Sequence, residues 1–458
     1  MEKVIIGGGQ GFWGDSNDAA VHMVRHSNIN YMACDYLAEL TLSIMARQKL
    51  KNPQAGYAGD FIGMMKECGQ EAYEKNIKVL TNAGGMNIKG MVDVLAAQAR
   101  EQKLYDMKIG YVTGDEISAQ IPELLRQGVT FDNMDDTGSF EEVKDKIYNA
   151  NVYFGHEPIL DCLKQGADMV ITGRSTDSAL FLAPCMYELG WEPDDWNNLA
   201  RGIMAGHLLE CGGQGAGGNY DYGWRDVPRM DELGFPIAEV TKDDFVITKA
   251  PDCGGIICEQ SCKEQFLYEV HDPANYITPD VTVDISQASL TQIGENRVRV
   301  KNIRGKKRPE MLKVSMGYHA GYKVVGMLSF AWPDAYEKAQ YAADIIKKKM
   351  KRKGLQAEEV RVDYIGVNAL HLGVADMDEK KLKDVNEVVL RIAVRTVKKE
   401  EAYKLVPEIA PLQLNGPPGA SFFGGRPKVQ EVIGLWPALV PRDAVKLESH
   451  ILRVGQEQ

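Results

Sequence analysis

The first half of the chain repeats one pattern five times: a short apolar run that ends in glycine and polar or charged residues. The apolar runs and the segments that follow them are 3–6 with 7–15, 78–80 with 81–87, 109–112 with 113–115, 169–171 with 172–177, and 207–209 with 210–215. Parallel strands of α/β proteins carry their active sites at their carboxyl ends. Glycine lets the backbone come close to a ligand there. The pattern predicts an α/β protein with a ligand site.

Composition limits the class of protein. The chain has 458 residues, enough for two or three domains, and it is 44% hydrophobic and 26% charged, as globular proteins are. No apolar run is long enough to span a membrane, and the N-terminus begins almost directly with a strand, so we expect a cytoplasmic protein with no membrane partner. The net charge of -11 argues against nucleic-acid binding, and we interpret the basic stretch 347–353 as a solvated helix end.

Three parts follow from the distribution of strand and helix patterns. Residues 1–225 alternate strand and helix signals, which predicts a mainly parallel sheet with flanking helices. An open three-layer sheet and a barrel both fit this alternation, and the open sheet is favoured. Residues 226–320 predict a β-rich connecting region. Residues 321–458 predict a smaller α+β domain with two similar strand–helix units, whose strands are 324–330 and 388–394.

Neither the cysteines nor the first glycine loop matches a cofactor motif. Cys253, Cys258 and Cys262 form C-x4-C-x3-C, which is neither a zinc nor a ferredoxin spacing, so free thiols are expected and no metal site is predicted. Residues 9–14 fit the letters G-x-G-x-x-G, but Phe and Trp inside the loop are unlike a pyrophosphate cradle. A substrate loop, with Asp15 capping the next helix, is the preferred interpretation.

Arg174 lies between a predicted strand and a helix N-terminus. An arginine in this position can grip a carboxylate or phosphate with two hydrogen bonds. Capping of the helix by Ser175 or Thr176, with Arg174 on the surface, is the alternative. Both interpretations stay open.

Titratable residues follow two of the other runs. Along a strand, His207 and Cys211 would share one face and Glu210 the other. Glu210 could then act as a general acid or base if burial raises its pKa, whereas Cys211 is more typical of a buried thiol. Asp115 is a candidate for proton transfer or for a helix cap. Asp15, Asp35 and Asp115 together could hold Mg²⁺.

The same segments resemble the acyclic terpene utilisation AtuA family. The resemblance runs through 9–15, 81–87, 167–174, 205–211 and 276–281, and order and spacing agree over roughly 1–450. It implies a role in catabolism of citronellol-like terpenes without an agreed reaction. Some family members carry an extra small C-terminal domain or are encoded with a small companion protein, so the resemblance implies a separate small subunit here. Ser175 and the pair Gly215–Ala216 depart from the family pattern.

We therefore expect an oligomeric catabolic enzyme, a lyase or hydratase that acts on a branched or unsaturated carboxylic acid or its CoA thioester. A non-catalytic binding or scaffold subunit and a Mg²⁺-dependent hydrolase are the alternatives, and no cofactor is identified. The expected catalytic residues are Glu210, His207 and Asp115. The expected substrate-binding residues are Gly9, Gly11, Asp15, Asn82, Gly84, Gly85, Arg174, Ser175, Thr176 and Gln214.

Overall fold

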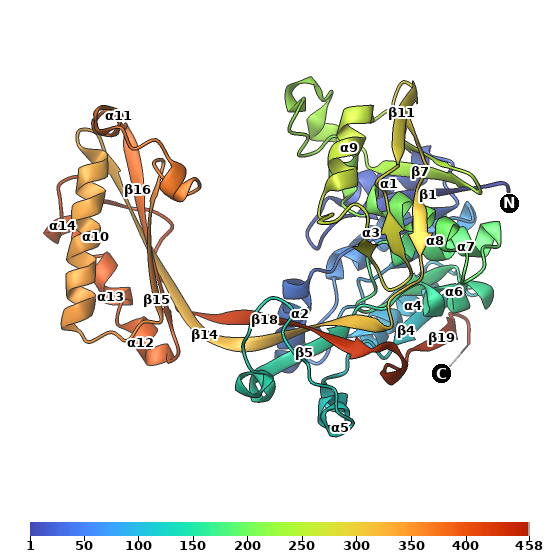
Figure 1. Cartoon of the computed structure of the whole chain (residues 1–458), viewed down its shortest axis with the longest axis horizontal. Helices are drawn as coiled ribbons and strands as arrows, with labels where there is room; N and C mark the ends of the chain where they lie inside the picture. The colour runs from blue at the N-terminus through green and yellow to red at the C-terminus, as the bar shows by residue number, and fades with distance from the viewer. Residues whose placement is uncertain (457–458) are drawn as a thin grey trace. The chain divides into compact units, whose positions relative to one another are not determined.

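The fold is known from a computed structural model, which describes residues 1–456. These residues form two compact units, one of residues 1–317 with 435–458 and one of residues 318–434 (Figure 1). The predicted domain boundaries differ from these units, because the strands 236–241, 245–249, 289–294 and 297–301 join the large sheet of the first unit, and so does the last strand of the chain.

The first unit is built on an open ten-stranded sheet. From edge to edge its strands are β11 (Ser289–Gly294), β12 (Arg297–Lys301), β8 (Phe245–Lys249), β7 (Pro236–Thr241), β1 (Lys3–Gln10), β2 (Tyr31–Cys34), β3 (Lys78–Thr81), β6 (Met169–Ile171), β4 (Lys108–Thr113) and β19 (Glu448–Arg453). The described residues form no closed barrel. Only the five strands from β1 to β4 in this order are parallel, and the outer strands are antiparallel, so the sheet is mixed rather than mainly parallel.

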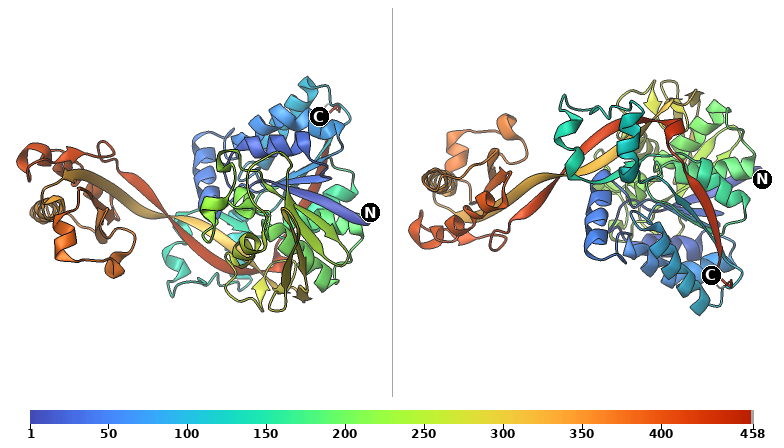
Figure 2. Two further views of the ribbon diagram at one scale, coloured as in Figure 1. Left: turned by 90° about the horizontal axis from the view of Figure 1, so that it is seen from above. Right: turned by 90° about the horizontal axis from the view of Figure 1, so that it is seen from below.

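Helices cover both faces of this sheet (Figure 2). One face packs against α1 (Asn17–His26), α3 (Gly59–Glu74) and α4 (Ile88–Glu101), and the other against α6 (Glu157–Lys164), α7 (Ala179–Leu189) and α8 (Trp196–His207). Strand residues alternate between the two cores: Tyr31 and Ala33 of β2 join one, Met32 and Cys34 the other. This alternation follows from the two-residue period of a strand.

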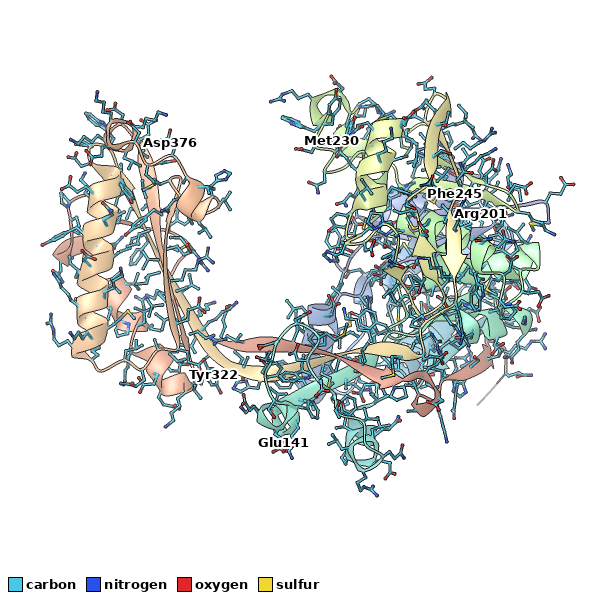
Figure 3. All side chains as sticks on the ribbon, viewed as in Figure 1. Glu141, Arg201, Met230, Phe245, Tyr322 and Asp376 are labelled. Carbon is cyan, nitrogen blue, oxygen red and sulfur yellow. The ribbon has the colours of Figure 1, made fainter. Side chains whose placement is uncertain are left out.

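The antiparallel strands carry their own part of the core. Phe245 of β8, labelled in Figure 3, is fully buried in the cluster that contains α7 and α8. A small three-stranded sheet of β9 (Tyr276–Ile277), β10 (Thr282–Asp284) and β13 (Arg304–Lys306) lies beside α8, and α9 (Glu259–Leu267) packs against the segment 212–216. The remaining elements of this unit are α2 (Glu39–Lys51), α5 (Ile121–Arg126) and β5 (Ile147–Val152).

The second unit is antiparallel. Its strands follow the order β15 (Glu359–Ile365), β16 (Glu387–Thr396), β14 (Met311–Ala331) and β17 (Ser421–Phe422), and β18 (Gln430–Pro441) also pairs with β14. The predicted strands 324–330 and 388–394 lie within β14 and β16. Helix α10 (Ala335–Arg352) covers this sheet with an apolar stripe at helical spacing that includes Ala339, Ala343 and Ile346. Short helices α11 (Glu379–Lys383), α12 (Lys399–Tyr403), α13 (Val406–Ile409) and α14 (Leu412–Asn415) complete it.

One of the five predicted strands is a helix. His207 is the last residue of α8, and residues 208–209 lie in the turn that follows it. The buried residues Leu199, Ile203 and His207 recur every four positions along one face of α8. This spacing is that of the buried face of a helix. Leu208 and Leu209 are buried as well, just after the end of α8, and so resemble the end of an apolar strand. The first glycine run also differs from the prediction, because Gly7, Gly8 and Gly9 lie within β1 rather than after it.

Candidate functional site

Polar side chains from neighbouring parallel strands meet at the carboxyl edge of the sheet. Asp35 follows β2 and Asn82 follows β3, and the amide of Asn82 donates to the carboxylate of Asp35. Beyond β6 and β4, the backbone N–H of Arg174 donates to Asp115 Oδ2 at 2.8 Å. Three of the five predicted strand ends, together with the end of β2, thus supply one edge, as expected for parallel strands.

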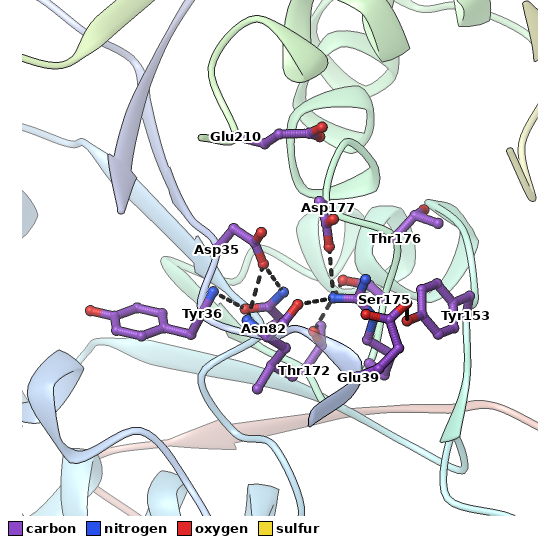
Figure 4. Close-up of polar contacts among 12 residues, drawn as sticks. Asp35, Tyr36, Glu39, Asn82, Tyr153, Thr172, Ser175, Thr176, Asp177 and Glu210 are labelled. Atoms are coloured by element: carbon purple, nitrogen blue, oxygen red, sulfur yellow. Dashed lines mark hydrogen bonds and ion pairs between the residues drawn. The ribbon is translucent and has the colours of Figure 1, made fainter. Parts of the chain in front are cut away.

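Arg174 is the centre of this group, which we call the arginine cluster: Asp35, Glu39, Asn82, Tyr153, Arg174 and Asp177. Figure 4 labels Asp35, Glu39, Asn82, Tyr153 and Asp177. The Arg174 side chain is only 5% exposed. Its Nη1 lies 2.7 Å from Asp177 Oδ1 and also donates to the carbonyl of Leu37. Its Cζ lies 4.1 Å from the centre of the Tyr153 ring. Burial opposes the charge of Arg174, but Asp177 and other anions outweigh it and hold its pKa above the usual value.

Two carboxylates beside Arg174 hold protons unusually tightly. Burial, followed by the charge of Asp177, raises the pKa of Asp35 well above its usual range. Burial raises the pKa of Asp177 to about 6 against the opposing charge of Arg174, and the charge of Glu210 adds to the increase. The side chain of Asp177 is nevertheless 31% exposed, so it can meet a ligand. Asp177 therefore suits proton transfer near neutral pH, and the raised pKa of Asp35 favours its protonated form.

Glu39 shows the opposite behaviour. Tyr153 donates its hydroxyl to Glu39 Oε1 at 2.5 Å, and Lys313 Nζ lies 3.1 Å from the same oxygen. Burial favours the neutral acid, but this hydrogen bond and the charge of Arg174 outweigh it and lower the pKa of Glu39 to about 2. Glu39 is thus ionised at neutral pH and accepts the hydrogen bond that orients the Tyr153 ring beneath Arg174.

His207 and Glu210 form a buried pair. The prediction that they lie on opposite faces is wrong because α8 continues to His207 and the next residues form a turn, which places residues three apart on one side. His207 Nδ1 lies 2.9 Å from Glu210 Oε1, and His207 Nε2 is buried without a partner. Burial works against the imidazolium, but Glu210 outweighs it and raises the pKa of His207. The centre of the Tyr276 ring lies 5.5 Å from the centre of the His207 ring.

The predicted capping roles are not observed. Helix α1 is capped by Ser16 and not by Asp15, and α7 begins at Ala179, beyond Ser175 and Thr176. Ser175 is fully buried, and Thr176 donates its hydroxyl to the carbonyl of Phe154 at 3.3 Å. Asp115, 2% exposed, accepts from Asn151 at 2.9 Å as well as from Arg174. These residues hold the loop after β6 in place.

The glycines make room for protein. A side chain on Gly8 would meet the carbonyl oxygen of Leu209 at 2.6 Å, and one on Gly11 would meet the carbonyl carbon of Cys211 at 2.6 Å. The segment 209–212 therefore packs against the first glycine run. The other predicted glycines are equally crowded by protein atoms: Gly9, Gly84 and Gly85.

A cavity of about 820 Å³ takes up another part of the predicted site. Gly11, Asp15, Cys211 and Gln214 line it, whereas the arginine cluster does not. Gly11 N–H and Ser16 N–H donate to the carboxylate of Asp15 at 3.0 and 2.8 Å, yet burial outweighs these bonds and raises its pKa. Of the predicted substrate-binding residues, Gly11, Asp15 and Gln214 thus line this cavity, whereas Asn82 and Arg174 belong to the arginine cluster.

Several polar residues escaped the sequence analysis. Asp177 had a signal, because it lies three residues after Arg174 in the same loop. Tyr153 and Glu39 had none, since the fold brings them together across 114 residues. The same holds for His156, whose Nδ1 lies 2.7 Å from Asp280 Oδ1 in a second buried pair.

No group of three or more His, Cys, Asp or Glu side chains that could hold a metal ion exists among residues 1–456, so Asp15, Asp35 and Asp115 do not form one ligand set. Within the same residues, every helix is too short or too polar to cross a membrane.

The fold places this chain among the α/β proteins, with an open sheet and a buried polar cluster at the carboxyl edge of its parallel strands. The model of the acyclic terpene utilisation family protein AtuA matches residues 4–451. The chain belongs to this family. No curated protein and no solved structure gives a significant match.

Proposed function

We propose that this chain is a catabolic lyase or hydratase that adds water to, or eliminates it from, an unsaturated carboxylic acid or its CoA thioester. The observation that carries the proposal is the grouping of proton carriers near Arg174. Asp35 and Asp177 have raised pKa values, and the charge of Glu210, which pairs with His207, acts on both. Such pairs of groups, poised in different protonation states, are typical of acid–base catalysis.

Asp177 and Asp35 divide the proton transfers in the hydration direction. Asp177, as a carboxylate, takes a proton from water, whose oxygen bonds to the β-carbon of the substrate. The π electrons move toward the carbonyl, and Asp35, as an acid, gives its proton to the α-carbon. The proton on Asp177 returns to Asp35 through solvent, which balances the reaction. Elimination is the reverse.

His207 and Asp115 have supporting roles in this proposal. His207, whose pKa is raised by Glu210, donates through Nε2 in its imidazolium form to the carbonyl oxygen on which negative charge develops. Arg174 holds Asp177, and Asp115 holds the backbone of Arg174. Asp115 is therefore assigned to positioning instead of proton transfer.

The test is turnover of a panel of unsaturated acids and their CoA thioesters. Asp177→Asn and Glu210→Gln keep the side-chain shape but remove the base or the partner of His207, and each should lower kcat by at least about 100-fold. Asp145→Asn, at an exposed site, is the matched control and should keep full activity. Full activity in both site variants would disprove the assignment.

A binding or scaffold subunit is the second candidate. The second unit exposes large apolar side chains: Leu370 is 92% exposed, Val374 85% and Leu414 93%. Such surface is typical of protein–protein contacts. Co-purification of a small subunit from the native host, together with activity only in the complex, would favour this candidate, whereas an active chain on its own would count against it.

A further inference from the structure

We infer that the cavity of about 820 Å³ binds an organic ammonium ion, a primary amine carried on an apolar body. The cavity lies wholly within the first unit. The inference goes beyond the proposed function, whose substrate is an acid or its thioester and whose acid–base residues do not line this cavity.

The cavity lies at the carboxyl end of β1, where the connections of the sheet diverge to opposite faces. Strand β1 pairs in parallel with β2 and antiparallel with β7. From β1 the chain passes to α1 on one face, whereas it reaches β7 from α8 on the other. Ligand sites of open α/β sheets form at such points. Most of the lining comes from these two connections, as the segments 11–22 and 211–235.

Negative charge prevails among the residues that line the cavity. The lining carboxylates are Asp15, Asp18, Asp231, Glu232 and Asp252, and the lining basic residues are Arg229 and His22. Arg229 Nε donates to Glu232 Oε2 at 2.6 Å, so these two charges compensate each other. Within residues 1–456, none of the other four carboxylates lies in an ion pair. A phosphate or carboxylate would meet this surplus of like charge, whereas an ammonium ion would compensate it.

Asp15 supplies an acceptor of fixed orientation. The backbone N–H of Gly11 donates to its Oδ2 at 3.0 Å, and the N–H of Ser16 donates to its Oδ1 at 2.8 Å. Each carboxylate oxygen can accept a further hydrogen bond. Burial raises the pKa of Asp15, whereas a nearby ammonium charge would favour its ionised form. Asp15 therefore gains a compensating partner when an ammonium ion binds.

Exposed apolar side chains line the same cavity. They are Phe12, Tyr268 and Met230, of which Figure 3 labels Met230. The face of an aromatic ring attracts an ammonium ion, and apolar surface is stabilised by contact with a hydrocarbon body. A single metal ion would use neither contact, and no group of three His, Cys, Asp or Glu side chains among residues 1–456 could hold one. The volume is that of a site for a small organic molecule.

The experiment compares three probes that share a phenyl group: 2-phenylethylamine, its neutral counterpart 2-phenylethanol, and the anion 3-phenylpropanoate. Isothermal titration calorimetry of the full chain at neutral pH should give an affinity for the amine at least about tenfold higher than for the alcohol. The affinity for the amine should fall as salt rises, because ions screen the carboxylates. Equal or tighter binding of the alcohol or the anion overturns the inference, and so does failure of the amine to bind.

Two variants test whether the amine binds in this cavity. Asp15→Asn removes the oriented carboxylate and should lower the affinity for the amine about three- to fivefold. The double variant Asp231→Asn/Asp252→Asn changes only exposed side chains, so the fold should tolerate it, and the affinity should fall about threefold. Asp145→Asn, exposed and outside the lining, is the control and should keep the affinity. Unchanged affinity in both cavity variants would place the amine elsewhere and overturn the inference.

Discussion

Arg174 lies over the ring of Tyr153, with its Cζ 4.1 Å from the ring centre, and the Tyr153 hydroxyl donates to Glu39 at 2.5 Å. The Tyr153 side chain thus contacts the buried cation Arg174 through its ring and the carboxylate of Glu39 through its hydroxyl. Neither contact is local in sequence, since β5 and the loops after β2 and β6 bring the three residues together. The position of Arg174 depends on this contact as well as on Asp177.

Replacement of Tyr153 should separate the two contacts. Tyr153→Leu removes the ring from a 7% exposed site and should lower the free energy of unfolding by about 2–4 kcal/mol. Tyr153→Phe keeps the ring beneath Arg174 and should cost about 1 kcal/mol through the lost hydrogen bond. Urea unfolding measures both, and Tyr105→Leu at a 54% exposed site is the control. Equal losses in the Leu and Phe variants would contradict a role for the ring.

Glu39 should make stability depend on acid pH. Its pKa in the folded protein is about 2, below the usual value, so the folded state favours the carboxylate. The resulting stabilisation is present above about pH 4.5 and is lost as the pH falls toward 2. Since the side chain is 33% exposed, solvent screening reduces the effect to about 1–2 kcal/mol. Glu39→Gln should lower stability at pH 7 and flatten the unfolding curve between pH 4.5 and 2, and an unchanged pH dependence would exclude the role.

His207 should titrate above the usual histidine value of about 6.5. The raised pKa stabilises the folded state below the unfolded pKa, and this contribution is lost as the pH rises through the folded pKa. In Glu210→Gln the burial remains without the carboxylate, so the pKa should fall below the usual value. NMR titration of the imidazole measures both values. A histidine that titrates identically with and without Glu210 would rule out the pair.

The crowded glycines should tolerate no side chain. Gly8→Ala places Cβ 2.6 Å from the Leu209 carbonyl oxygen and should cost at least about 2 kcal/mol of unfolding free energy, because backbone on both sides must move. Gly63→Ala is the matched control. It lies inside α3 with open space beside it and should stabilise by about 0.5–1 kcal/mol. Thermal unfolding compares them, and a neutral Gly8→Ala would show that the contact is loose.

The sequence predicted the parts of the site that depend on strand order. Asp35, Asn82, Asp115 and Arg174 each follow an apolar run, and parallel pairing makes their positions converge whatever the rest of the chain does. Asp15 and Gln214 were grouped with them on the same reasoning, yet they line a separate cavity. A strand-end pattern identifies the edge of the sheet at which residues lie, but it does not tell which of those residues line the same cavity.

The local apolar pattern gave a wrong prediction at residues 207–209, where both a strand and a helix fit the spacing. The apolar pair 208–209 resembles a strand end, and only the buried face of α8 before it shows that the helix continues to His207. This difference changes the chemistry, because a helix end places His207 and Glu210 in contact whereas a strand would separate them.

By itself, the sequence determined the family, the parallel centre of the sheet and the residues at its carboxyl edge, because two-residue alternation and glycine-ended strands are local properties. Only the tertiary structure decided the electrostatics. Asp35 and Glu39 act on Arg174 across more than a hundred residues of chain, and their pKa values depend on burial and on distances between charges. Burial and distances between charges are set only when the helices pack on the sheet, so the sequence pattern does not reveal them.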